Sequence, residues 1–488
     1  MPTITLPSRE IPVIGDYDVI VAGGGPGGIP AAVAAARAGA RTLLIERYGY
    51  LGGMATAGLI NVILGVHASG TDEPMIGGIA EEICRGMTSL GGAPDFDDAV
   101  SRGGINFEPE AYKLVSDSLV LESGVDPRLH SWAVDTIMED GRITALVLES
   151  KSGRQAVTGK VFVDATGDAD LVAQSGARFA HGRQFDGAVQ AMGSMFRFGG
   201  ADEERLPTGE ERAAIIERGW AAMDAGEINC FNPSWGDMVA EKIEGEHMVN
   251  AMRFPGDATS AEDLTRAEVQ IRRDTWGLIE WWRENVPGLE NAYLIQSPPH
   301  VGIRESRQMI GHERIVGQDV LDARRHEDVV ARGCYYIDIH CPLGRVKNAT
   351  HMCYKNCPND PPCAYYEERY EELPGRDEDA HLPMRPRDGL SQQEWDRPRA
   401  KPRDGLWFDI PWGCLVSADV PNLLAAGRNI SADHHGMAAV RVIGTCMSIG
   451  QAAGEGAAIA AGEDPAGDAS QVDVTTLQQR LRANRAAI

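Results

Sequence analysis

The pattern of apolar and polar positions predicts a strand, a helix and a second strand close to the N-terminus. Residues 17–22 form a short apolar run rich in β-branched side chains, which is typical of a buried parallel strand. Residues 29–38 are rich in alanine and predict a helix that ends at Gly39, and residues 42–45 form another apolar strand. This order of elements indicates one half of a doubly wound α/β sheet.

The same patterns predict the remaining elements and one long irregular segment. Residues 348–404 are polar, charged and rich in proline, which favours a surface loop or lid. A β-hairpin is predicted around the turn Asp140-Gly141, between strands 136–139 and 143–149. The other predictions are helices over 76–90, 109–123, 203–223 and 261–284, and strands over 129–134, 161–164, 335–340, 407–416 and 422–426.

Three glycines between the first strand and its helix carry the first functional signal. Gly23, Gly25 and Gly28 fit the pattern G-x-G-x-x-G, which serves a tight turn, a close approach to a pyrophosphate and close helix–strand packing. The N-terminus of the following helix offers unpaired N–H groups to phosphates. Glu46 ends the second strand, where an acid can accept a hydrogen bond from a ribose hydroxyl. These features predict a dinucleotide site, without separating NAD from FAD.

Six further stretches resemble the FAD-dependent oxidoreductase family of the glutathione-reductase-like flavoprotein fold. In chain order they are LIERYGYLGGMAT, VDATGDAD, IRESRQMIG, YYIDIHCP, FDIPWGCLV and AAGRNISADHHGMAAVRVIGTCMSIGQAAG. The resemblance implies an α/β fold with FAD as cofactor: a Rossmann-like FAD-binding domain with a central parallel sheet, interrupted by an inserted α+β substrate domain. The FAD-binding domain would comprise 1–190 and 405–488, and the substrate domain 191–404.

The resemblance also implies which residues contact FAD. They follow the strand ends and the glycine turns, and the main chain just before the hairpin is expected to contact adenine. The expected contacts are Gly23, Gly25, Pro26, Gly28, Glu46, Arg47, Gly52, Gly53, Met54, Ala55, Ala133, Val134, Thr166, Gly167, Asp168, Gly427, Arg428, Arg441, Gly444 and Thr445.

Candidate catalytic residues follow from the same resemblance. The family has a histidine and an arginine at the positions of His434 and Arg441, close to the flavin ring. A neutral imidazole can take the proton of an alcohol or amine, and an arginine can stabilise negative charge on reduced flavin. Arg304 is a third candidate; with Glu305 and Arg307 it could instead form a salt-bridge cluster between the domains. Tyr336, Asp338 and His340 alternate along a predicted strand and are weaker candidates on the substrate side.

Missing motifs and the charge narrow the chemistry. The sequence has no second G-x-G-x-x-G after a strand and no C-x4-C after Glu46, which argues against an NAD(P)H domain and a disulfide reductase. Electrons would then leave to O2, a quinone or another protein. The net charge of −25 disfavours nucleic acid as a partner. No apolar run approaches the roughly 20 residues of a membrane span, and we expect a cytoplasmic protein.

The sequence thus predicts an FAD enzyme that oxidises a small organic substrate, an alcohol, sugar, amine or hydroxy acid, by hydride transfer to flavin N5. The alternative is a flavin subunit of a multi-component reductase or electron-transfer system. That alternative would use Cys341, Cys353, Cys357 and Cys363 for a cluster, but their spacing lacks the usual C-x2-C, and we expect no metal. The substrate, the oxidant, covalent attachment of FAD and a homo-oligomeric state are left open.

Overall fold

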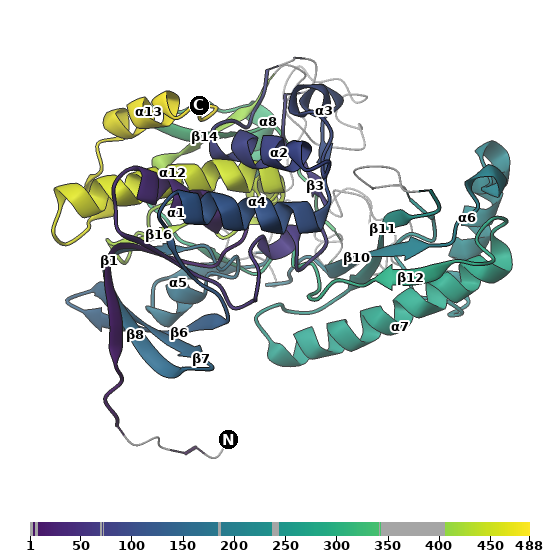
Figure 1. Cartoon of the computed structure of the whole chain (residues 1–488), viewed down its shortest axis with the longest axis horizontal. Helices are drawn as coiled ribbons and strands as arrows, with labels where there is room; N and C mark the ends of the chain where they lie inside the picture. Colours follow the sequence, from purple (N-terminus) through teal and green to yellow (C-terminus); the bar gives the residue numbers. More distant parts are fainter. Residues whose placement is uncertain are drawn as a thin grey trace, which may run out of the picture.

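The computed structural model describes residues 3–4, 8–68, 71, 73–183, 187–236, 244–340, 342 and 406–488. These residues form two lobes that lie side by side along the longest axis (Figure 1). The first lobe holds the N-terminal and C-terminal segments, and the second is formed by the middle of the chain. Each lobe has a hydrophobic core of its own.

The first lobe is built on a seven-stranded sheet with the order β5-β2-β1-β8-β7-β6, where β16 also pairs with β8. Strands β1, β2, β5, β8 and β16 are parallel, and β6 and β7 continue from β8 as an antiparallel meander. The apolar runs of the sequence supply the buried faces of these strands. The strands are β1 Val13–Ala22, β2 Thr42–Ile45, β5 Asp126–Arg128, β6 Ser131–Glu139, β7 Arg142–Ser150, β8 Gly153–Asp164 and β16 Leu423–Ala425.

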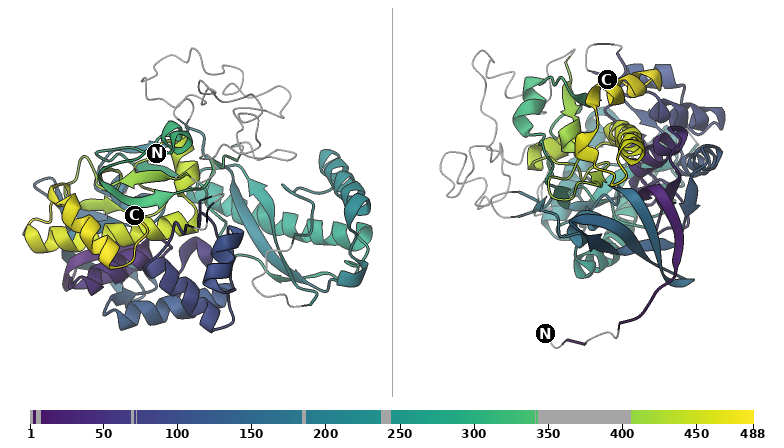
Figure 2. Two further views of the ribbon diagram at one scale, coloured as in Figure 1. Left: turned by 90° about the horizontal axis from the view of Figure 1, so that it is seen from above. Right: turned by 90° about the vertical axis from the view of Figure 1, so that its left-hand side faces the viewer.

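Two helices from distant parts of the chain pack tightly on this sheet. Helix α1 (Gly28–Arg37) follows the glycine turn, and α12 (Ile443–Glu463) lies against it, as two views agree (Figures 1 and 2). A Cβ at Gly450 would overlap the main chain of Gly27, and one at Gly454 would overlap that of Ala31. The small residues of α12 therefore let the two backbones come together, close to the glycine turn.

The second lobe is a three-stranded antiparallel sheet with the order β11-β10-β12, covered by long helices (Figure 2). Its strands are β10 Met192–Gly199, β11 His247–Phe254 and β12 Tyr293–Gln296, and its helices are α6 Gly209–Asp224 and α7 Ala261–Asn285. Phe196, Phe198 and Trp282 pack together at the centre of the second core. The side chain of Ser260 caps α7 by accepting a hydrogen bond from the N–H of Asp263 at 3.2 Å.

The remaining elements belong mainly to the first lobe. The remaining helices are α2 Ile79–Ser89, α3 Phe96–Arg102, α4 Pro109–Glu122, α5 Asp170–Gln174, α8 Gly317–Asp322, α11 His434–Val440 and α13 Val474–Ala483. The remaining strands are β3 Val62–Ile63, β4 Ile105–Asn106, β9 Phe179–His181, β13 Arg307–Met309, β14 Val329–Gly333 and β15 Phe408–Pro411. Strands β14 and β15 pair with each other and bring Gly333 opposite Phe408. Short 3₁₀ turns span Gly53–Ala55, Glu203–Arg205, Trp412–Cys414 and Ala469–Gln471. Within the described residues, no helix combines the length and apolar character that crossing a bilayer requires.

Most predicted elements are confirmed, and several need correction: the strand predicted over 407–416 is confirmed only at Phe408–Pro411, and the helix predicted over 203–223 begins at Gly209. The hairpin turn is where it was expected, with Asp140 and Gly141 both at positive φ, as a type I′ turn requires. The strand predicted over 335–340 is wrong: β14 ends at Gly333, and the residues after it are irregular. The strand predicted over 129–134 begins only at Ser131, because residues 129–130 form a turn after β5.

The two cores bear on the predicted domain limits. The buried residues of the second core run from Met192 to Ile303, whereas Met309 and Ile339 already pack in the first core. The division into 1–190, 191–404 and 405–488 stays a prediction. We propose that the inserted unit ends near residue 303, because the chain beyond that point packs with the FAD-binding half.

Candidate active site

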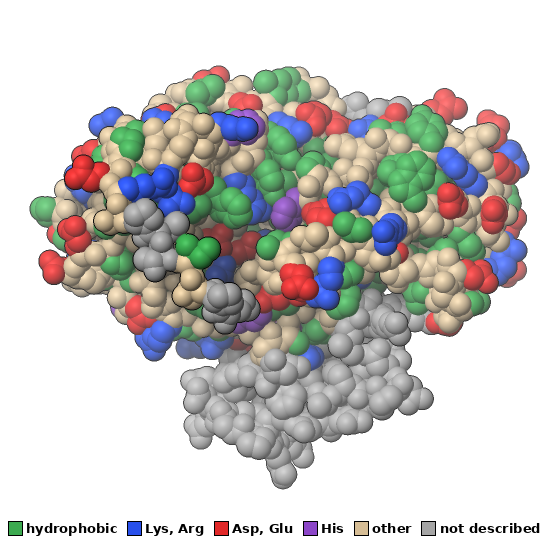
Figure 3. All heavy atoms as spheres, turned by 90° about the horizontal axis from the view of Figure 1, so that it is seen from below, with side chains coloured by type: hydrophobic (Ala, Val, Ile, Leu, Met, Phe, Trp, Pro, Cys, Tyr) green, Lys and Arg blue, Asp and Glu red, His purple; other side chains and the backbone are tan. Residues whose placement is uncertain are grey.

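Two adjoining cavities lie at the carboxyl ends of the parallel strands. The first, which we call the nucleotide cleft, has a volume of about 110 Å³ and follows the glycine turn toward Glu46 and Ala133. The second, the reaction cavity, has a volume of about 440 Å³ and reaches between the lobes. Gly25, Gly167 and Arg428 line both. Seen from below, the molecule has a hollow near its middle with charged side chains inside it (Figure 3).

The glycine turn is shaped by close backbone contacts. A Cβ on Gly28 would overlap the carbonyl oxygen of Gly23, so only glycine lets the start of α1 approach the end of β1. Gly23 itself has a φ of +105° and faces the main chain of Ala165. The N-terminus of α1 therefore points its N–H groups toward the cleft at the position that a pyrophosphate requires.

Glu46 is held at the end of β2 by two backbone donors. Its Oε2 accepts from the N–H of Gly24 at 2.8 Å, and its Oε1 accepts from the N–H of Tyr48 at 2.9 Å. Burial raises the pKa of this carboxyl above its usual value. A carboxylate can accept about four hydrogen bonds, so Glu46 keeps capacity for the hydroxyls of a ribose.

A buried acid that the sequence analysis did not single out organises the next turn. Asp164, at the end of β8, accepts from the hydroxyl of Thr166 at 2.7 Å and from the N–H of Val172 at 3.1 Å. Asn429 donates to the same carboxylate at 3.1 Å from the segment after β16. Asp164 thus joins three chain segments at one edge of the sheet. The sequence feature that could have identified Asp164 is its position at the end of an apolar strand.

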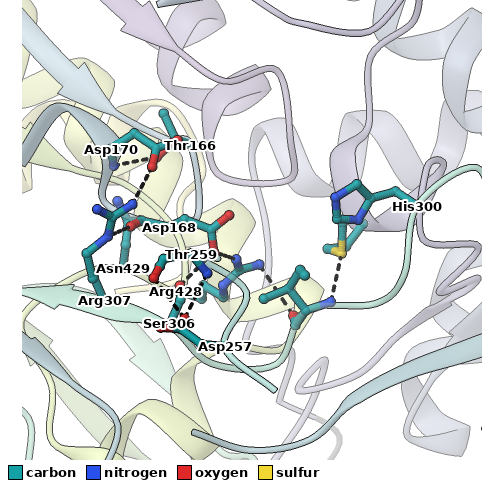
Figure 4. Close-up of polar contacts among 12 residues, drawn as sticks. Thr166, Asp168, Asp170, Asp257, Thr259, His300, Ser306, Arg307, Arg428 and Asn429 are labelled. Atoms are coloured by element: carbon teal, nitrogen blue, oxygen red, sulfur yellow. Dashed lines mark hydrogen bonds and ion pairs between the residues drawn. The ribbon is translucent and has the colours of Figure 1, made fainter. Parts of the chain in front are cut away.

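Asp168 and Arg428 form a buried ion pair where the two cavities meet (Figure 4). Asp168 also accepts from the hydroxyl of Ser306 at 2.6 Å, and its carbonyl oxygen accepts from Arg307 at 2.7 Å. Arg307 reaches on to Asp170 at 2.5 Å, which makes it a structural tie between segments. The Nε of Arg428 is buried without a hydrogen-bond partner among the described residues, so this guanidinium retains a donor for a ligand.

The predicted FAD contacts fall into three groups: those that line the nucleotide cleft, those that line only the reaction cavity, and those that line neither. Gly23, Gly25, Pro26, Glu46, Arg47, Gly53, Met54, Ala133, Thr166, Gly167, Asp168 and Arg428 line the nucleotide cleft, and Gly427 and Arg441 line the reaction cavity. The others are absent from both linings: Gly28, Gly52, Ala55, Val134, Gly444 and Thr445. Gly28 packs under the turn, and Gly444 and Thr445 lie in the first turn of α12, which has no side-chain cap. The hydroxyl of Thr445 is buried without a partner among the described residues.

The reaction cavity holds a network centred on Asp338. Arg441 donates to its side chain at 3.1 Å and to its carbonyl oxygen at 2.9 Å, and the Nε2 of His340 lies 3.1 Å from its other carboxylate oxygen. Burial lowers the pKa of His340 to about 3, so its imidazole is neutral at neutral pH. The hydroxyls of Tyr335 and Tyr336 are 2.9 Å apart. The predicted strand is absent here, yet the chain still brings these residues to the cavity.

Two more arginines line the reaction cavity, Arg253 from β11 of the second lobe and Arg304 from the segment that leaves it. Arg304 is partly buried and donates to the carbonyl oxygen of Ala191 at 3.0 Å. Arg253, on β11, was not singled out in the sequence, although an arginine in the apolar run HMVNAMRF was a usable signal. Burial and the neighbouring arginines lower the pKa of Arg304 to about 9 and also lower that of Arg253. Arg304 thus faces the cavity, whereas Arg307 serves as a tie.

His434, the base candidate from the sequence, contacts a carboxylate behind the cavities. It begins α11, is buried, and its Nδ1 lies 2.7 Å from Oε1 of Glu305. The second oxygen of Glu305 accepts from the N–H of Gln190 at 2.9 Å. His434 does not belong to the lining of either cavity, so its base role stays a prediction.

The four cysteines considered for a cluster follow β14 in the chain. Cys341, Cys353, Cys357 and Cys363 lie outside the described residues. Cys334, just before them, is largely buried, and its thiol donates to the carbonyl oxygen of His67 at 3.0 Å. Burial raises the pKa of this thiol to about 12, which keeps it protonated.

The fold and the two cavities define a flavin-dependent oxidoreductase. The glycine turn and Glu46 suit the nucleotide half of the cofactor, and the uncapped N-terminus of α12 beside an arginine-lined cavity suits the flavin ring. The open donor of Arg428, which lines both cavities, fits a bound FAD. The family model for FAD-dependent oxidoreductases matches residues 18–366 and 378–481, and the chain belongs to that family. FAD is its cofactor.

Individual relatives are more distant. Digeranylgeranylglycerophospholipid reductase 1 of Methanopyrus kandleri is 30% identical over 156 residues, which are 31% of this chain and 40% of that protein. Dihydrolipoyl dehydrogenase of Trypanosoma brucei brucei is 51% identical over 45 residues, or 9% of each. A geranylgeranyl bacteriochlorophyll reductase-like protein of Thermoplasma acidophilum has a TM-score of 0.44 and 14% identity, covering 97% of this chain and 84% of that one. The curated relatives are thus matched over about two fifths of their length or less.

Proposed function

We propose that the protein oxidises a small organic molecule that carries a hydroxyl or amino group on the carbon to be oxidised. One observation supports this most: the reaction cavity of about 440 Å³ adjoins the nucleotide cleft and contains a neutral imidazole oriented by a carboxylate. The bound flavin supplies a two-electron acceptor for the hydride of that carbon. The side chains of this protein must then hold the substrate and take its proton.

His340 is our candidate for the proton acceptor. Its Nε2 lies 3.1 Å from the carboxylate of Asp338, which orients the ring, and burial lowers its pKa so that the imidazole is neutral at neutral pH. Asp338 is in turn held by Arg441, which fixes the position of the carboxylate. His434, the candidate from sequence, is proposed instead as a positioning residue that joins the start of α11 to Glu305.

The test separates the two histidines. Anaerobic mixing of the FAD-loaded protein with pools of alcohols, sugars, amines and hydroxy acids identifies the pool that bleaches the flavin band. With that pool, His340→Asn should lower the rate of flavin reduction 10²- to 10⁴-fold, as expected when a general base is lost. His181→Asn is the matched control, because His181 forms a similar pair with Asp257 at 3.2 Å outside both cavities.

Three results would overturn parts of the proposal. If His340→Asn reduces within about threefold of the parent and His434→Asn does not, His434 is the base. If neither variant slows reduction, no histidine takes the proton. If no pool bleaches the flavin but NADH or a partner protein does, the protein is a reductase or electron-transfer subunit. Reintroducing oxygen, and then a quinone, identifies the electron acceptor.

A further inference from the structure

The charges that line the reaction cavity are unbalanced. Among the described lining residues, the charged side chains are Arg253, Arg304, Arg428 and Arg441 against the single acid Asp338. Arg428 is paired with Asp168, and Arg441 with Asp338. Arg253 and Arg304 have no carboxylate partner among the described residues. Burying a charge without a partner is costly, and a bound anion would remove that cost.

The two unpaired guanidinium groups lie beside each other over Gly193. A Cβ at Gly193 would overlap Nη1 of Arg304 and would lie 3.0 Å from Nη1 of Arg253. A side chain at this position of β10 would therefore have to displace the end of Arg304. Burial and Arg441 lower the pKa of Arg304; burial, Arg304 and Arg441 lower that of Arg253, and Asp338 acts in the opposite direction on both. The arrangement is unfavourable unless something negative binds between or beside them.

The hydrogen bonds of Arg253 leave one edge of its guanidinium open. Its Nη1 donates to the side chain of Asn250 at 2.8 Å and to the carbonyl oxygen of Met252 at 2.7 Å. The ring of Phe231 covers one face, with its centroid 3.9 Å from Cζ. Nε and Nη2 are buried and have no partner among the described residues. These two N–H groups form the parallel fork that binds both oxygens of a planar carboxylate.

We propose that the substrate carries a carboxylate, bound by the Nε–Nη2 edge of Arg253 with Arg304 beside it. Hydroxy acids and amino acids are then the substrate class, because the carboxylate and the oxidised carbon must share one cavity. This inference rests on the proposed function for its reaction, but anion binding itself can be measured without turnover.

The probe is benzoate, with benzamide as its uncharged match and inorganic phosphate as a different anion. Binding is followed in the oxidised, FAD-loaded protein by the change in flavin absorbance, and in the apoprotein by the shift in Tm. Benzoate should bind at least tenfold more tightly than benzamide. Arg253→Met should weaken benzoate at least tenfold, and Arg253→Lys should recover only part of the loss, because lysine keeps the charge without the fork. Arg205→Met, which removes an exposed arginine paired with Glu290, is the matched control.

Each outcome supports or overturns either the carboxylate site or the proposed function. Equal binding of benzamide, or unchanged benzoate binding in Arg253→Met, overturns the carboxylate site; if Arg253→Met does not fold, Arg304→Met takes its place. Phosphate binding that exceeds benzoate binding and depends on Arg253 would replace the carboxylate by a phosphate ester. If neutral alcohols or amines reduce the flavin while benzoate does not bind, this inference fails and the proposed function stands. If benzoate binds through Arg253 but no hydroxyl or amino compound reduces the flavin, the proposed function fails instead.

Discussion

The nucleotide cleft and the reaction cavity adjoin, yet they are built in opposite ways. The cleft is formed by backbone N–H groups, small residues and charges that are satisfied locally, such as Glu46 with two backbone donors. The cavity is lined by long charged side chains from both lobes, and Arg253 and Arg304 lack acidic partners among the described residues. The difference indicates that the charges of the cleft are mostly balanced within the protein, whereas the positive charges of the cavity are balanced only in part.

The largest expected effect lies in the cleft and tests its dependence on backbone contact. Gly28→Val should abolish FAD binding, because a Cβ would overlap the carbonyl oxygen of Gly23 and force α1 away from β1. The flavin-to-protein ratio of the purified variant measures this. Gly277→Ala in α7 is the control: nothing lies within 4 Å of its Cβ position, and we expect full FAD content. Normal flavin content in Gly28→Val would contradict the packing argument.

A smaller effect is expected where the two regions meet. Asp168→Ala leaves the buried guanidinium of Arg428 without its carboxylate, which should cost about 3–5 kcal/mol in the free energy of unfolding. Denaturant unfolding of the apoprotein measures the change. Arg178→Gln removes an exposed pair with Asp419 and should leave the free energy of unfolding almost unchanged. Similar costs for both variants would show that burial is not what distinguishes the junction.

The smallest effect concerns pH and the cavity. His340 is buried with its pKa lowered to about 3, and it faces Asp338, which raises the pKa, and Arg304 and Arg253, which lower it. The unfolded chain takes up a proton near pH 6.5 and the folded chain does not, so stability falls as pH drops below 6.5. Between pH 7 and pH 5 the parent should lose about 2 kcal/mol more than His340→Asn. Unfolding curves at the two pH values measure this, and a parallel loss in both proteins would refute it.

The sequence predicted the cleft better than the cavity, for a physical reason. Gly23, Gly25, Gly28 and Glu46 belong to one local unit whose spacing sets its geometry. Arg253 reaches the cavity only because β11 packs beside β10 in the second lobe, and no local pattern contains that information.

The same dependence on tertiary packing applies to two other predictions from the sequence, the strand over residues 335–340 and the role of His434. Alternation over residues 335–340 predicted a strand, but none of the described strands pairs with these residues, and an irregular segment carries Asp338 and His340 to the cavity. His434 was assigned by resemblance alone, and its contact with Glu305 depends on tertiary packing. The adjoining segment with Cys353, Cys357 and Cys363 lies outside the described residues.

The close packing of α1 against α12 has a consequence for biosynthesis. The glycine turn is synthesised before the second lobe, whereas β16 and α12 follow only after the whole second lobe has been made. Domains generally fold as units, and contacts between distant segments form slowly. The nascent chain must therefore hold β1, β2 and β8 with one edge of their sheet uncovered until its C-terminal segment arrives. The packing of α12 against the glycine turn is consequently a late event, because it must await synthesis of residues 443–463.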